Sequence, residues 1–134
     1  MYKRILIPIA PEHYDKYSGA FEVARTLLAP GGVVSILSVI EDIPAYVDNY
    51  VPDDLVKKNM AEVASALKAR FSEVGTKTFV VSGHSANTIL AWAKQNQVDC
   101  IVILSHQPGL SDYFIGSTAA RVVRHATCAV HVLR

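Results

Sequence analysis

The stretch from Ile103 to Ala126, ILSHQPGLSDYFIGSTAARVVRHA, joins the end of an apolar strand to a helix through a polar loop. The run IVIL at 101–104 predicts the strand. Residues 117–125 predict the helix, with Ala120 and Val123 facing inward. The first N–H groups of a helix are free to bind an anion, so Gly116-Ser117-Thr118 predicts a phosphate site. The stretch lacks the glycine and lysine pattern of a P-loop.

The rest of the chain alternates apolar strand-like runs with amphipathic helical patterns. Strands are predicted at 5–9, 33–40, 79–81, 101–104 and 129–133, and helices at 17–28, 53–74, 86–96 and 117–125. Ser85 is the expected N-cap of the third helix, and Gly31-Gly32 should break the chain before the second strand. Strict alternation predicts an α/β fold with a parallel sheet, helices on both faces, and a single domain over residues 1–134.

Composition narrows the classes of partner. The chain has 134 residues, 13 basic and 12 acidic, with a net charge of +1. This balance argues against nucleic acid or an anionic membrane as the partner. No apolar run approaches the roughly 18 residues that span a bilayer, and the N-terminus does not resemble a signal peptide. We therefore expect a cytoplasmic protein.

The two cysteines, Cys100 and Cys128, lie in apolar, strand-like runs. Free cysteine is among the most buried residue types, so we expect two reduced thiols in the core. A zinc site would need more ligands at close spacing, and the sequence offers none, so no metal site is predicted.

Topology places a ligand site beyond the carboxyl ends of the strands, where the strand order reverses. In a five-stranded sheet of this kind that point lies between the first and fourth strands, near 8–11 and 104–109. Two readings of Ser117 remain open: a phosphate ligand, or an ordinary helix cap. His106 is either a surface residue or a catalyst, and no carboxylate is paired with it by spacing. No catalytic residue is predicted.

Four segments together resemble the universal stress protein family over nearly the whole chain: KRILIPI, SILSVIEDIP, GHSANTILAWAKQNQVDCIVILSH and GLSDYFIGSTAARVVRHATCAVHVLR. The C-terminal third is the most specific, and its loop is similar to those of the small enteric stress proteins of types F and G. The resemblance implies the adenine-nucleotide α-hydrolase type of fold, with strand order 3-2-1-4-5. It also implies a homodimer, and binding of ATP or another adenine nucleotide, with or without Mg²⁺.

The ATP-binding members carry G-x2-G-x9-G-[ST] after the fourth strand. Gly116 and Ser117 match its last two positions, whereas the first glycine aligns with Leu104 and the second falls near Gln107. The family's usual aspartate after the first strand is Ala10. The nucleotide-binding residues implied by the resemblance and the helix start are Pro8, Ile9, Val39, Ser105, His106, Gly116, Ser117 and Thr118.

These features predict an adenine-nucleotide-binding, dimeric stress-response module without strong catalytic activity. The alternative is an interaction protein of the same fold that has lost nucleotide binding, which Ala10 and Leu104 favour. An ATPase or phosphotransferase is opposed by the lack of a Walker lysine or a general base. The apolar strand 129–133 is the expected dimer contact; the competing reading is that a neighbouring helix covers it.

Overall fold

The structure, a computed structural model, describes residues 1–10, 17–41, 53–73, 75–105 and 115–134. Five parallel strands form one sheet in the order β3-β2-β1-β4-β5. They are β1 (Tyr2–Pro8), β2 (Leu28–Ile40), β3 (Thr76–Ser82), β4 (Cys100–Leu104) and β5 (Ala129–Leu133). The predicted fold class and strand order are confirmed.

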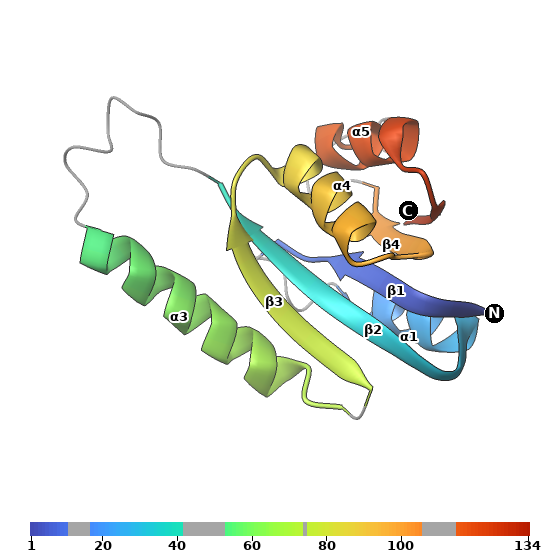
Figure 1. Ribbon diagram of the computed structural model, residues 1–134, viewed down its shortest axis with the longest axis horizontal. Coiled ribbons are helices and arrows are strands. Elements are labelled where there is room, and N and C mark those ends of the chain that lie inside the picture. The colour runs from blue at the N-terminus through green and yellow to red at the C-terminus, as the bar shows by residue number, and fades with distance from the viewer. Residues whose placement is uncertain (11–16, 42–52, 74, 106–114) are drawn as a thin grey trace.

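Helices cover both faces of the sheet (Figure 1); those in the described part of the chain are α1 (Ser18–Leu27), α3 (Asp53–Arg70), α4 (Ser85–Gln95) and α5 (Ser117–His125). Two apolar clusters show which face each covers. Ala20, Ala24 and Leu67 of α1 and α3 pack with Ile5 and Ile7 of β1. On the opposite face, α4 and α5 pack on the other side of the same strands.

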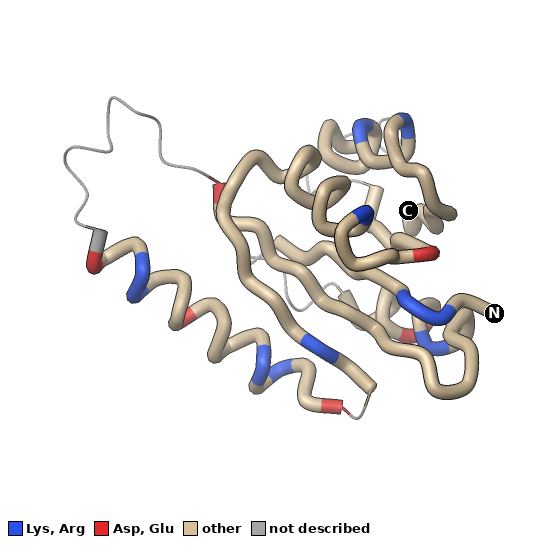
Figure 2. Tube along the Cα trace, in the orientation of Figure 1, with Lys and Arg blue, Asp and Glu red and all other residues tan. Residues whose placement is uncertain are grey.

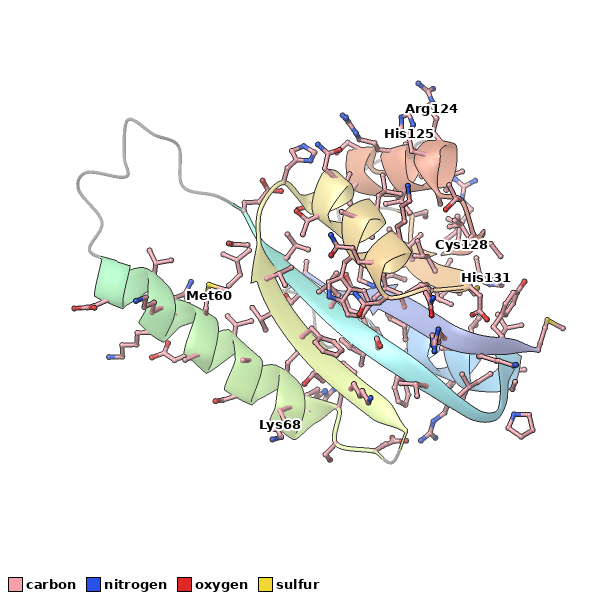
Figure 3. The ribbon with its side chains drawn as sticks, viewed as in Figure 1. Met60, Lys68, Arg124, His125, Cys128 and His131 are labelled. Carbon is pink, nitrogen blue, oxygen red and sulfur yellow. The ribbon has the colours of Figure 1, made fainter. Side chains whose placement is uncertain are left out.

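Helix α3 shows why the apolar spacing predicted a helix on the sheet. Leu67 is fully buried, while Val63 and Phe71 pack against the same cluster. Met60 is partly buried and lies on the sheet side, whereas Lys68 is exposed and points away from the sheet (Figure 3). Residues of both charges are spread along α3 (Figure 2). Burial of one apolar stripe holds this helix in place.

The central strands are buried on both faces, as their continuous apolar runs predict. Ile5, Leu6 and Ile7 of β1 are at most 1% exposed, and Ile101 and Val102 of β4 are fully buried. The two edge strands, β3 and β5, are only partly buried. Parallel strands covered by helices on both faces cannot alternate between apolar and polar residues, which is the pattern of the sequence.

Several predicted boundaries are wrong. β1 and β3 begin three residues earlier than predicted, because polar residues at their starts still pair with β2. β2 begins at Leu28 and contains Gly31 and Gly32, with a register irregularity opposite 2–4 of β1. Gly31 has φ +76°, so the glycines form this irregularity within the strand and do not precede it. α3 ends at Arg70, short of the predicted position 74.

The inward face of α5 differs from the prediction by one residue. Ala119 and Val122 are 3% and 0% exposed, whereas Val123 is 46% exposed and Ala120 is partly buried. Both pairs have the same helical spacing, so periodicity could not choose between them. Packing against β4 and β5 selects Ala119 and Val122.

Candidate functional site at the carboxyl ends of β1, β2 and β4

The carboxyl ends of β1 and β4 lie at the point where the strand order reverses. β1 pairs with β2 as far as Pro8 and Leu37, and the N–H of Ile9 extends this ladder by donating to the carbonyl of Leu37 at 2.8 Å. Among the described residues, the ladder between β1 and β4 covers only two pairs and stops at Leu6 and Ile101. Helices leave these strands on opposite faces, which is the arrangement in which α/β sheets bind ligands.

Ser105 is fixed by its backbone immediately after β4. Its N–H donates to the carbonyl of Leu133 at 2.7 Å, and its carbonyl accepts the N–H of Gly116. The residue is 2% exposed. This pair of contacts joins the end of β4, the end of β5 and the start of α5, so Ser105 and Gly116 lie together at the reversal point.

Gly116 is the N-cap of α5, and its carbonyl accepts the N–H of Ala120 at 2.8 Å. A glycine has no side chain with which to cap the helix, and no side-chain hydrogen bond caps it from the described residues. Ser117 is the first helical residue and is exposed, so the reading that Ser117 is the helix cap is wrong. The N–H groups of the first turn are thus left for a ligand or water.

The charge around this helix start also suits an anion. The first turn of α5 contains no acidic residue. Arg121 and Arg124 follow on the same helix, and Figure 2 shows basic but no acidic residues along α5. The partial positive charge of a helix N-terminus therefore has no described carboxylate on the same helix to oppose it.

The predicted residues on β1 and β2 contribute in different ways. Pro8 ends β1 and lies directly opposite Leu37. The side chain of Ile9 is 3% exposed and belongs to the cluster under α1, so any ligand contact from Ile9 must come from its backbone. Val39 is partly buried against the cluster under α4 and α5. Thr118 is half-buried in the first turn of α5, and His106 lies outside the described residues.

The two departures from the family pattern have specific surroundings. The side chain of Leu104 packs against the cluster under α1, so part of its bulk is taken up by the core. The N–H of Ala10 donates to the hydroxyl of Tyr17 at 3.1 Å, and Tyr17 is 7% exposed. Tyr17 thus brings a phenolic oxygen to the end of β1, next to the position where Ala10 lacks a carboxylate.

Sequence reasoning missed Tyr17 because its contact with Ala10 depends on how α1 docks, which no local spacing reveals. The available signal is weak: a tyrosine directly before an amphipathic helix supplies an apolar ring and a polar tip. Buried tyrosine hydroxyls usually find a hydrogen-bond partner.

A second polar cluster lies at the start of α4. The carboxylate of Glu41, directly after β2, accepts hydrogen bonds from the N–H of Ser85 at 3.3 Å and from its hydroxyl at 2.5 Å. The N-cap of α4 is His84, whose Nδ1 accepts the N–H of Asn87 at 3.4 Å, so the predicted cap, Ser85, is wrong. The start of α4 is therefore occupied by a carboxylate of the chain itself, in contrast to the start of α5.

The arrangement of the described thiols and acidic groups bears on metal binding and reactivity. In the part of the chain that the structure describes, no three His, Cys, Asp or Glu side chains are grouped to hold a metal ion. Both cysteines are free; burial raises the pKa of the Cys100 thiol to about 11 and also raises the pKa of the Cys128 thiol. These thiols are therefore protonated and weakly nucleophilic at neutral pH.

Together, the sheet order and the helices on both faces define an α/β protein whose strand order reverses between β1 and β4, beside the start of α5. The sequence profile of the universal stress protein family matches residues 1–134. The chain belongs to the universal stress protein family. No helix among the described residues is long and apolar enough to cross a membrane.

Individual relatives agree with this assignment. The chain is 27% identical to a universal stress protein of Methanocaldococcus jannaschii, over 100% of this chain and 83% of that one. It is also 27% identical to universal stress protein G of Salmonella typhimurium, over the full length of both. The solved structure of the universal stress protein UspA from Lactobacillus plantarum has a TM-score of 0.76 at 26% identity, covering 99% of this chain and 98% of that one.

Two more distant structures share the fold and were solved with nucleotides. One is a universal stress protein in complex with cAMP, with a TM-score of 0.64 at 13% identity, covering 99% of this chain and 97% of that one. The other is the universal stress protein from Archaeoglobus fulgidus in complex with dAMP. Its TM-score is 0.56 at 17% identity, and the match covers 99% of this chain and 98% of that one.

Proposed function

We propose that this protein binds an adenine nucleotide between the ends of β1 and β4, with the phosphates at the start of α5. The observation that carries the proposal is the start of α5 at Gly116, which no described side chain caps and which is held beside β4 by Ser105. Two universal stress proteins of the same fold, solved with cAMP and dAMP, support the choice of an adenine nucleotide.

The described residues offer more binding groups to the phosphates of a nucleotide than to its adenosine. Backbone N–H groups and the hydroxyls of Ser117 and Thr118 would hold the phosphates. At the adenosine end Ala10 offers no carboxylate, and the nearby polar group is the Tyr17 hydroxyl. Losing one hydrogen bond to a charged group costs about 1.5–3 kcal/mol, so we expect affinity in the micromolar range or weaker.

Isothermal titration calorimetry with ATP, with and without Mg²⁺, tests the proposal. Gly116→Val should abolish binding, because a branched side chain would fill the space that the phosphates need, whereas Ala10→Asp should tighten it. Gly19→Ala is a matched control, since a Cβ at Gly19 has no atom within 4 Å. Wild-type protein that fails to bind ATP would favour the alternative, an interaction protein of the same fold. Unchanged binding by Gly116→Val would place the site elsewhere.

We also propose that the protein acts as a cytoplasmic homodimer that pairs through β5 and does not turn over substrate rapidly. β5 is an edge strand of mostly apolar residues, and such edges favour pairing with another chain. Sedimentation equilibrium should show a dimer at micromolar concentration, and Val130→Pro should weaken it.

The expected absence of rapid turnover has its own test. A steady-state ATPase rate near 1 s⁻¹ would indicate an enzyme, and His106→Ala would then be the first variant to examine.

A further inference from the structure

Along β5, the backbone N–H and C=O groups of alternate residues point either toward β4 or toward the outer edge of the sheet. The carbonyl of Leu133 accepts the N–H of Ser105, so Leu133 faces β4. In a parallel ladder, alternate residues direct both backbone groups to the same neighbour, which gives Ala129 and His131 the same direction as Leu133. The N–H and C=O groups of Val130 and Val132 therefore point to the outer edge of the sheet, where no described strand pairs with them.

Two-fold symmetry limits how two such edges can pair. An axis perpendicular to the sheet keeps each side chain on its own face, and directly opposed residues of an antiparallel pair share a face. One residue must therefore lie opposite its own copy. Within β5, pairing centred on Val130 or on Val132 forms two backbone hydrogen bonds. Pairing centred on His131 places Val130 opposite Val132 of the other copy. The outward N–H and C=O groups of both valines then form four backbone hydrogen bonds.

We propose that two copies of this chain pair their β5 strands in the register that places Val130 opposite the partner's Val132 and His131 opposite its own copy. This rests on the dimer proposed above. His131 is then a pair without backbone hydrogen bonds between its members, with Cα atoms about 4.5 Å apart and the side chains close together. The two imidazoles meet on the face of the sheet that α1 covers, because Leu133, which lies on the same side of β5, packs in that cluster.

Few charged groups near His131 could reduce the repulsion between two charged imidazole rings. The side chain is exposed, and its ring has no hydrogen bond or ion pair among the described residues. From β4, the titratable group on the same face is the protonated thiol of Cys100. The charged residues of α1 are Glu22, which is exposed, and Arg25, which pairs with Glu73.

The opposite face of β5 carries α5, whose charged groups are Arg121, Arg124 and His125. Figure 3 shows Arg124 and His125 at the end of α5, whereas His131 comes from the strand. None of these groups is an anion, so they do not neutralise a positive charge on His131. The nearest carboxylate before β4, Asp99, accepts hydrogen bonds from the N–H groups of Lys3 and Arg4.

The register makes the dimer sensitive to pH. An imidazole can take up a proton and become a cation, and like charges directly opposite on paired strands are unfavourable. Two imidazolium groups at this separation repel enough to weaken association roughly tenfold in a partly solvated site. We expect the dimer dissociation constant to rise about tenfold between pH 7.5 and pH 5.5 at constant ionic strength.

Sedimentation equilibrium at these two pH values tests the pH effect. His131→Thr should remove the dependence, since threonine pairs well across strands and does not titrate. His125→Gln, which removes an exposed histidine on the other face, should retain it. A wild-type dimer of equal strength at both pH values would overturn the register while leaving the dimer intact. A wild-type monomer at both values would overturn the dimer itself.

Disulfide trapping tests the register independently of pH. In a Cys128→Ser background, His131→Cys should cross-link on oxidation, because a Cα separation of about 4.5 Å suits a disulfide. Val130→Cys is the matched control: in this register its own copy lies beyond the roughly 7 Å limit for a bridge. Cross-linking of Val130→Cys without that of His131→Cys would move the centre to Val130 and refute the proposal.

Discussion

Gly83, between β3 and α4, should not tolerate a side chain. It has φ +144°, a backbone conformation open almost only to glycine, and its N–H donates to the carbonyl of Ile40 at 3.0 Å. A Cβ built at Gly83 would lie 2.5 Å from the hydroxyl oxygen of Thr88 and 3.7 Å from its Cβ. Gly83→Ala therefore adds both backbone strain and a steric clash.

The two effects have different sizes. Holding a non-glycine residue in this region costs about 1–3 kcal/mol. Moving the Thr88 side chain out of its rotamer costs a further ~1 kcal/mol, because only the end of a short side chain must shift. We expect Gly83→Ala to lower the free energy of unfolding by about 2–4 kcal/mol.

Urea unfolding followed by circular dichroism measures this loss, which should appear as a midpoint about 1–2 M lower at unchanged slope. The Thr88→Ala substitution removes the clash but not the backbone strain. In a Thr88→Ala background, Gly83→Ala should therefore cost about 1 kcal/mol less than it costs in the wild type. Gly19→Ala, within α1 and with no atom within 4 Å of the added Cβ, should stabilise by about 0.5–1 kcal/mol. If Gly83→Ala unfolded within 0.5 kcal/mol of the wild type, the strain argument would be wrong.

Two further predictions concern buried polar groups. Because burial raises the pKa of Cys100 from 9.0 to about 11, unfolding exposes a thiol that ionises more readily, so stability should fall as pH rises from about 9 to 11. Denaturant midpoints across this range should show the fall, and Cys100→Val should reduce it; an equal fall in the variant would assign the effect to other groups. The hydroxyl of Ser38 is fully buried and has no hydrogen-bond partner among the described residues. Ser38→Ala should therefore be neutral or slightly stabilising in thermal unfolding, and a loss above about 2 kcal/mol would show that the hydroxyl has a partner.

The topology could be predicted because the strands and helices differ sharply in composition. Runs such as ILIPI and IVIL are continuously apolar, as strands buried on both faces must be, and the helices between them carry apolar stripes. Strand starts were harder to predict: Arg4 is exposed, yet it belongs to β1 and pairs with Val33 of β2. Hydrogen bonding of the backbone, which side-chain pattern does not report, extends such strands.

The candidate site was predictable where it depends on local sequence and not where it depends on docking. Gly116 and Ser117 follow from the helix start alone. The contact of Tyr17 with Ala10 requires α1 to pack against β1, and that of Glu41 with Ser85 spans 44 residues along the chain. Residues far apart in sequence meet through tertiary packing, which a single sequence does not encode in any local spacing.

The hydrogen bond from Gly116 to Ser105 has a consequence for how this family can diversify. It joins the two ends of the segment between Ser105 and Gly116. Both ends are also held by residues outside that segment: Leu133 binds Ser105, and the buried Ala119 and Val122 fix α5 on the sheet. The entropy of closing a segment grows only slowly with its length. Insertions, deletions and substitutions between the two anchors should therefore accumulate at small cost to the fold during evolution.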